Sequence, residues 1–316
     1  MSDPVLDIDV AGWVERVKHD PVAYRQRQAI EITLNAIAMT APFNEKLYLK
    51  GGILMGLVYN SPRQTSDIDF TANLDVAMDI DTKIRLLLNG AFSRAAAMLG
   101  YADLVVKIHS IKPKPKSSNF ETAQFPALKM KIGYALRGSR QEGALLKCKS
   151  PDVIDVDISF NEAMRAIRIL RLTGGQALRA YSLIDLIAEK YRAMLQQVVR
   201  NRNRRQDVYD LHLLIQDEVI DADCRAQVLE TFLEKSHSRH IKPDRDSLDN
   251  PEIKRRCGAQ WDTFELELGS VPDFEMCFTR VRNFYRQLPW GGVIGAAAPA
   301  AKAVANAASD QPAARA

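Results

Sequence analysis

The run Asp67-Ile68-Asp69-Phe70, in which acidic and apolar residues alternate, constrains this chain more than any other segment. Alternation with a period of two predicts a half-buried β-strand and places both carboxylates on the same face. Two carboxylates so close together repel each other unless a cation lies between them. Magnesium binds hard oxygen ligands and combines carboxylates with substrate phosphates. The run therefore predicts a divalent-cation site, for Mg²⁺ or Mn²⁺, on one face of a sheet.

A glycine pair, Gly51-Gly52, precedes this run and follows a predicted short strand at 47–50. Glycines allow the backbone to approach a triphosphate closely and to present its N–H groups to the phosphates. Each motif alone is common, because Gly-Gly marks many turns and Asp-x-Asp marks many solvated strands. Their combination favours a nucleotide site over a turn beside a solvated strand.

A third acid is available on another predicted strand, Ile154-Asp155-Val156-Asp157-Ile158, where Asp155 and Asp157 again share one face. A third carboxylate on a neighbouring strand would complete a two-metal site for in-line displacement at phosphorus. The spacing alone leaves open which of the two acids it is.

Hydrophobic periodicity divides the chain into a mixed α/β half and a helical half, an α+β fold. The elements expected in the first half are helices over 10–40 and 80–100 and strands over 104–108, 128–134 and 154–158. Ser182-Leu183-Ile184-Asp185 has the pattern of a capping box and predicts the start of the helical half. The expected divisions are a mixed-sheet domain over 1–175, a joint at Thr173-Gly174-Gly175, a helical domain over 176–290 and a disordered Ala-rich tail over 291–316.

Four motifs together resemble the nucleotidyltransferase superfamily, and more narrowly the AbiEii/MenT group of toxins from bacterial toxin–antitoxin and abortive-infection systems. They are Leu49-Lys50-Gly51-Gly52, Thr65-Ser66-Asp67-Ile68-Asp69-Phe70, Ala188-Glu189-Lys190-Tyr191-Arg192-Ala193 and Arg205-Gln206-Asp207-Val208-Tyr209-Asp210-Leu211. The resemblance implies a nucleotidyltransferase-type sheet domain, with a helical domain that contributes the last two motifs.

The resemblance also implies roles for individual residues. The metal ligands would be Asp67, Asp69 and Asp157, with Asp155 as the alternative third acid. The nucleotide-binding residues would be Gly51, Gly52, Thr65, Ser66 and Lys190. Asp207 would orient Lys190 or the acceptor, and Asp210 lies on the same helical face as Asp207. One position departs from the family pattern: Ile53 follows the glycines where the family has Ser or Thr, whose hydroxyl can contact a phosphate.

Basic residues gather locally although the net charge is only +4. The segment between the last two motifs carries Arg200, Arg202, Arg204 and Arg205, which we expect to contact nucleic acid. A second basic group comprises Lys107 and an expected loop, Lys112-Pro113-Lys114-Pro115-Lys116. For each group, a merely solvated surface is the competing interpretation.

The resemblance implies a metal-dependent transfer of a nucleotidyl group from a nucleoside triphosphate to an acceptor, with tRNA as the expected acceptor and a cognate antitoxin as a partner. A small-molecule nucleotidyltransferase of the antibiotic-modifying kind shares the glycine and acid core, but the motifs around Lys190 and Asp207 argue against it. A catalytically silent nucleotide- or RNA-binding protein stays open because of Ile53. We expect a cytoplasmic location, because the sequence shows neither a leader pattern nor a long apolar run.

Overall fold

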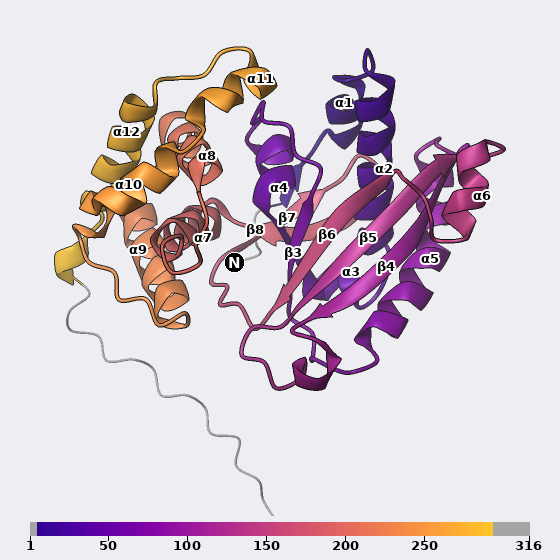
Figure 1. The fold of residues 1–316 in the computed structure, drawn as a ribbon, viewed down its shortest axis with the longest axis horizontal. Coiled ribbons are helices and arrows are strands. Elements are labelled where there is room, and N and C mark those ends of the chain that lie inside the picture. The colour runs from indigo at the N-terminus through magenta and orange to yellow at the C-terminus, as the bar shows by residue number, and fades with distance from the viewer. Residues whose placement is uncertain (1–4, 293–316) are drawn as a thin grey trace, which may run out of the picture.

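The computed structural model describes residues 5–292 and combines a mixed β-sheet, with helices packed against it, and an all-helical part (Figure 1). This arrangement confirms the predicted α+β class. The Ala-rich tail expected over 291–316 lies outside the described residues from 293 onward. None of the helices within 5–292 is long and apolar enough to cross a bilayer.

Within residues 5–292 the sheet has eight strands, in the order β1-β7-β8-β2-β3-β6-β5-β4. In that order they are β1 (Val5–Asp7), β7 (Ile167–Arg171), β8 (Ala177–Tyr181), β2 (Leu47–Lys50), β3 (Ile68–Ala72), β6 (Val153–Phe160), β5 (Ala127–Leu136) and β4 (Leu104–Lys114). The predicted strands are confirmed in β2, β3, β4, β5 and β6. The segment Thr173-Gly174-Gly175, expected at the joint, forms the turn between β7 and β8, so the sheet continues to Tyr181.

The central strands bring the motif residues together. β2 is antiparallel to β3 and pairs Lys50 with Asp69, and β3 is parallel to β6 and pairs Asp69 with Asp157. Register partners on neighbouring strands point to the same face of the sheet. Lys50, Asp69 and Asp157 therefore form a row across three strands.

Between residue 5 and the helical part the structure has six α-helices: α1 (Val10–Glu15), α2 (Pro21–Ala38), α3 (Phe43–Lys46), α4 (Gly51–Val58), α5 (Ile80–Met98) and α6 (Arg140–Leu146). The pattern predicted over 10–40 is two helices rather than one. Asp20 separates them, because its carboxylate accepts hydrogen bonds from the Val22 and Ala23 N–H groups and caps α2. Every residue from Ala29 to Ala38 is buried, so α2 is a core helix that packs on α5 and the sheet.

The helical part contains α7 (Leu183–Gln196), α8 (Arg205–Asp217), α9 (Ala222–His237), α10 (Pro251–Gly258), α11 (Glu265–Leu268) and α12 (Phe274–Arg286). Short 3-10 turns cover Ser117–Asn119, Ser247–Asp249, Trp261–Phe264 and Trp290–Gly292. The predicted cap at Ser182 is confirmed, since its hydroxyl accepts a hydrogen bond from the Asp185 N–H. Tyr191 of α7 stacks with Phe284 of α12, and this aromatic contact holds the motif-bearing helix in place.

The prediction of a basic loop over 112–116 is wrong for its first three residues. β4 runs through Lys114, because its partner β5 begins at Ala127 and continues the ladder that far. β4 is the edge strand, so Pro113 is tolerated there even though it offers no N–H group. The lysine side chains of this segment line an exposed sheet edge.

Candidate active site

A buried cation and several carboxylates meet on the central strands. Asp69 is half-buried on β3, with Lys50 on one side and Asp157 on the other. Burial raises the pKa of the Asp69 carboxyl to about 6; Lys50 opposes this shift, whereas Asp157 and Asp67 add to it. The surroundings of Asp69 are therefore short of positive charge, which is the condition that a bound divalent cation relieves.

The glycine pair is required by close packing against these residues. Gly51 has φ of +72°, and a Cβ on it would overlap the Oδ2 atom of Asp69. A Cβ on Gly52 would lie 2.7 Å from the Thr65 hydroxyl oxygen. Both glycines form the first turn of α4, whose free N–H groups suit an anion. Ile53 is fully buried in the core, so Thr65 is the hydroxyl that lies beside the glycines.

The two candidate third acids differ in position. Asp157 lines the cleft beside Asp69. Asp155 lies two residues earlier on β6 and does not line the cleft. Each is paired with a lysine of β5: Lys129 contacts Asp157, and Lys131 lies 2.9 Å from Asp155. The geometry therefore favours Asp157.

The donor set fits a divalent cation after one rearrangement. Among residues 5–292, no three acidic, histidine or cysteine side chains are already gathered as ligands. The Lys129 ammonium forms an ion pair with the Asp157 carboxylate, and Ser66 donates a hydrogen bond to Asp67. Burial, with smaller contributions from Asp157 and Asp67, raises the pKa of Asp69, and a bound cation would oppose that shift. A cation that displaced Lys129 from Asp157 would find three oxygen ligands on neighbouring backbone positions.

Lys190 lies in a second charged group, built from α7, α8 and the segment before β3. Its ammonium is 2.6 Å from the Oδ2 atom of Asp210 and 3.4 Å from the Oδ1 atom of Asp207. Arg63 lies 3.2 Å from the same Asp210 oxygen. Burial opposes the charged form of Lys190, but Asp210 and Asp207 outweigh it and raise its pKa. Lys190 is thus held protonated at the cleft, and the sequence motifs gave no role to Arg63.

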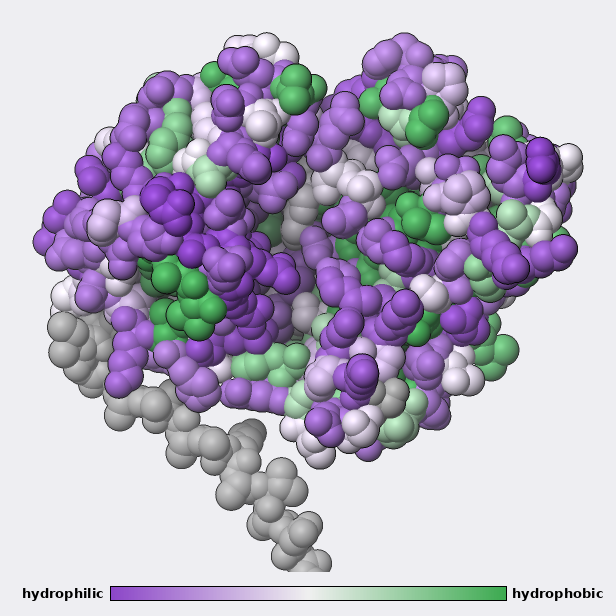
Figure 2. All heavy atoms as spheres, viewed as in Figure 1, coloured by the Kyte–Doolittle hydropathy of each residue, from purple (hydrophilic) through white to green (hydrophobic). Residues whose placement is uncertain are grey.

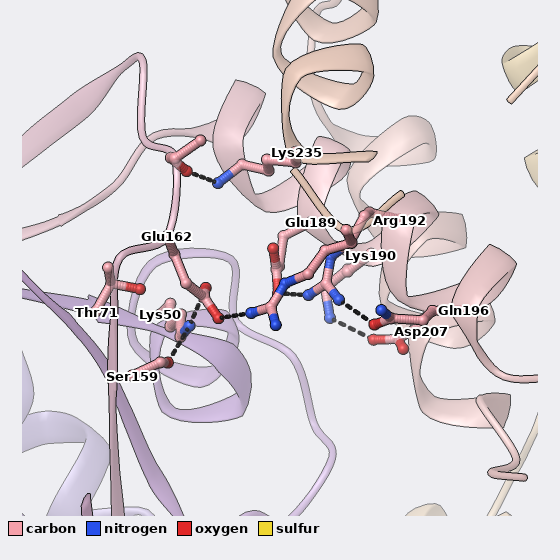
Figure 3. Close-up of polar contacts among 12 residues, drawn as sticks. Lys50, Thr71, Ser159, Glu162, Glu189, Lys190, Arg192, Gln196, Asp207 and Lys235 are labelled. Atoms are coloured by element: carbon pink, nitrogen blue, oxygen red, sulfur yellow. Dashed lines mark hydrogen bonds and ion pairs between the residues drawn. The ribbon is translucent and has the colours of Figure 1, made fainter. Parts of the chain in front are cut away.

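A third group of charges joins the sheet to the helical part (Figure 3). Lys50 donates hydrogen bonds of 2.8 Å to both Ser159 and Glu162. Glu162 also accepts a hydrogen bond of 3.0 Å from Arg239, at the end of α9. Burial alone would lower the pKa of Lys50, but the Tyr181 hydroxyl and the carboxylates of Glu162 and Glu189 raise it above its ordinary value. Sequence reasoning missed Glu162 and Arg239 because neither lies in a motif.

These groups line one cleft of about 550 Å³ between the sheet and the helical part. In the space-filling view the surface is hollowed there, and the residues around the hollow are mostly hydrophilic (Figure 2). Every predicted catalytic and nucleotide-binding residue lines it: Gly51, Gly52, Thr65, Ser66, Asp67, Asp69, Asp157, Lys190 and Asp207. A separate hollow of about 630 Å³ on α8, α9 and α12 contains none of them.

The structure brings three of the four predicted arginines to the cleft. Arg200, Arg202 and Arg204 line it. Arg205 points elsewhere, because its guanidinium donates hydrogen bonds to the Gln260 carbonyl and the Thr263 hydroxyl and stacks on Phe264.

The chain matches one family model, and its fold is similar to those of solved structures. A family model described as "Nucleotidyl transferase AbiEii toxin, Type IV TA system" matches residues 32–280. The fold is similar to JHP933 from Helicobacter pylori, with 14% identity, 83% of this chain and 90% of that chain covered, and a TM-score of 0.47. It is also similar to MenT4, a nucleotidyltransferase toxin from Mycobacterium tuberculosis, with 13% identity, 88% and 98% coverage, and a TM-score of 0.47. No curated protein matches the chain.

Proposed function

The chain belongs to the AbiEii nucleotidyltransferase toxin family of type IV toxin–antitoxin systems, and from that premise we propose that it transfers a nucleotidyl group from a nucleoside triphosphate to tRNA with the help of Mg²⁺ or Mn²⁺. The observation that carries this proposal is the row of Lys50, Asp69 and Asp157, which shares one cleft with the glycine pair and Lys190. A cytoplasmic location and a cognate antitoxin belong to the same proposal.

The proposed metal ligands are Asp67, Asp69 and Asp157. A divalent cation bound there would neutralise the phosphates and polarise the reacting phosphorus centre. Lys50 has a different task in this proposal. Its ammonium, held by Glu162 and Ser159, stabilises the ionised form of the neighbouring Asp69. The carboxylate is thereby available as a ligand despite its burial.

The proposed triphosphate site comprises the glycine pair, Thr65, Ser66 and Lys190. Gly51, Gly52, Thr65 and Ser66 line the cleft, and the N–H groups at the start of α4 and the two hydroxyls are of the kind that binds phosphate oxygens. Lys190 adds a protonated ammonium, which Asp207 and Asp210 orient. Because a compact ammonium can exchange carboxylate for phosphate with a small movement, Lys190 suits this task.

The proposed reaction is an in-line displacement at the α-phosphorus. A hydroxyl oxygen of the acceptor forms a bond to that phosphorus while the bond to the bridging oxygen breaks. Pyrophosphate leaves with the electron pair, and the hydroxyl proton passes to a base, for which Asp157 is the candidate. The protein contributes mainly by positioning the reacting groups and by stabilising the negative charge of the phosphates.

The arginine rim supports a nucleic-acid acceptor over a small molecule. Arg200 and Arg202 are exposed at the cleft, and Arg204 is half-buried there. A phosphodiester backbone uses several such cations, whereas a sugar or a drug has no need of them. The test is transfer of label from a nucleoside triphosphate to total tRNA, compared with the Asp69→Asn variant, which should be inactive.

A further inference from the structure

An arginine and a phenylalanine stack at one end of the cleft, and the proposed roles above do not involve them. The Arg239 guanidinium carbon lies 3.4 Å from the centre of the Phe125 ring. Both residues line the cleft, and both remain partly exposed. The guanidinium covers one face of the Phe125 ring, so a planar ligand in the cleft would stack on one of the two outer faces of the pair.

The guanidinium is fixed in its plane. Arg239 donates a hydrogen bond of 3.0 Å to Glu162, and the other oxygen of Glu162 accepts from Lys50 at 2.8 Å. Figure 3 shows Glu162 between Lys50 on the sheet and the helices of the other part. Arg239 is thus oriented before a ligand arrives, which lowers the entropy that binding must overcome.

The loop that carries Phe125 is held by two hydrogen bonds of its neighbour Gln124. Asn161, after β6, donates a hydrogen bond of 3.2 Å to the Gln124 carbonyl. The Gln124 side chain donates one of 3.4 Å to the Ser238 carbonyl, next to Arg239. Phe125 therefore sits on a loop that is tied to the sheet and to the end of α9.

The stacked pair lies on the side of Asp157 that is opposite the glycines. β5 begins at Ala127, two residues after Phe125, and Ala127 pairs with Ser159 of β6. Asp157 is two residues earlier on the same strand and points to the same face as Ser159. The residues proposed for the triphosphate come from α4, α7 and the segment before β3. The pair is thus next to the proposed base and away from the phosphates.

We propose that Phe125 and Arg239 form a platform on which an unpaired nucleobase of the RNA acceptor stacks beside the attacking hydroxyl. Proteins that bind single-stranded RNA stack its bases on aromatic rings and on arginine planes. The inference rests on the proposed function, and it adds two residues that would hold an unpaired base of the acceptor. Selectivity among base types would come from other contacts, because every base has a face that can stack.

The experiment measures RNA affinity and nucleotide affinity separately in Phe125→Leu and Phe125→Trp. The leucine keeps apolar bulk without an aromatic face, and the tryptophan keeps the face. Phe125→Leu should weaken equilibrium binding of total tRNA about 5- to 100-fold, the range expected for one stacked base. Phe125→Trp should stay near wild type. The affinity for labelled nucleoside triphosphate with Mg²⁺ should change less than two-fold in both variants, and circular dichroism should show folded protein.

A second arm tests whether the stacked base belongs to the single-stranded end. A short RNA with a tRNA-like single-stranded end is compared with the same RNA made abasic at its last nucleotides. Wild type should bind the abasic RNA more weakly than the intact RNA, by the same factor by which Phe125→Leu weakens binding of intact RNA. Phe125→Leu should bind the intact and the abasic RNA with equal affinity. Equal affinities of wild type and Phe125→Leu for intact RNA would overturn the inference. A loss confined to nucleotide affinity would also overturn it and assign the platform to the incoming base. Absence of nucleotidyl transfer would count against the proposed function only. The comparison of RNA affinities would still decide the inference, because RNA binding needs no turnover.

Discussion

Lys50 and Asp69 are register partners on β2 and β3, and the ammonium that faces Asp69 is also bound to Glu162. Even with this cation beside it, the Asp69 carboxyl has a pKa of about 6, because burial and the neighbouring Asp157 and Asp67 outweigh the attraction. The carboxylates are thus kept close together without enough positive charge. Such an arrangement costs stability, and a bound cation with its phosphates would restore it.

The first prediction concerns stability without metal. The folded-state pKa of Asp69, about 6, lies above its ordinary value of 3.8. The stabilising contribution of its protonation is therefore full below pH 3.8 and lost as pH rises through about 6. Asp69→Asn cannot ionise, so in EDTA its Tm should exceed that of wild type by about 2–4 °C at pH 7.5. The difference should vanish near pH 3.5.

The exposed Asp155 supplies the control for this comparison. Asp155→Asn should leave the Tm of the metal-free protein near that of wild type at both pH values. Mg²⁺ with nucleotide should narrow the gap between Asp69→Asn and wild type, since only the intact site gains from ligand binding. A less stable Asp69→Asn at pH 7.5 in EDTA would contradict the charge imbalance described above.

The second prediction separates the structural task of Lys190 from its catalytic one. Lys190→Met leaves the buried Asp210 with Arg63 alone and should lower the free energy of unfolding by about 3–5 kcal/mol. Lys190→Met combined with Asp210→Asn removes the uncompensated charge and should recover most of that loss in urea unfolding. Nucleotide affinity should stay low in the double variant. If the double variant recovered both stability and nucleotide affinity, the role of Lys190 would be purely structural.

The two lysine–aspartate pairs between β5 and β6 give a third prediction with an internal control. Lys129 competes with a cation for Asp157, whereas Lys131 pairs with Asp155 outside the cleft lining. Because the first pair is exposed, its loss should strengthen Mn²⁺ binding only about 1.5- to 5-fold, the range for a surface ion pair. Lys129→Ala should show this gain by electron paramagnetic resonance, and Lys131→Ala should not. Equal Mn²⁺ affinity in the two variants would argue against Asp157 as a ligand.

The elements that the sequence predicted are those encoded by local pattern. Alternation predicted the strands that carry Asp69 and Asp157, and the serine before α7 predicted where that helix begins. The carboxylate of Asp185 shows where local reasoning stops. It binds the Arg165 and Ala166 N–H groups and Lys235, residues that only the tertiary fold brings near.

The same limit explains the site residues that the sequence missed. Glu162 lies in the connection after β6, and Arg239 lies just after α9, so their pairing depends on how α9 packs on α7. Arg205 was predicted at the site but lies outside it. Its sequence neighbours line the cleft, but Arg205 donates hydrogen bonds to the Gln260 carbonyl and the Thr263 hydroxyl and stacks on Phe264, which hold it away from the cleft.

A fourth prediction uses that difference among the arginines. Arg202→Ala combined with Arg204→Ala should make the dependence of tRNA affinity on salt shallower by about one to two units of log–log slope, at about −0.7 per phosphate contact. Arg205→Ala should leave the slope unchanged, because this guanidinium does not line the cleft. The measurement is tRNA binding across a salt series. The same slope in the double variant as in wild type would favour a small-molecule acceptor.

The most direct test of the central claim is transfer of label from α-labelled nucleoside triphosphates to total tRNA in the presence of Mg²⁺. Wild type and Asp155→Asn should label the RNA and release pyrophosphate. Asp67→Asn and Asp69→Asn should fold and should lose transfer by at least about 100-fold, since each would remove a proposed metal ligand. Wild-type transfer by both Asp67→Asn and Asp69→Asn would contradict the account.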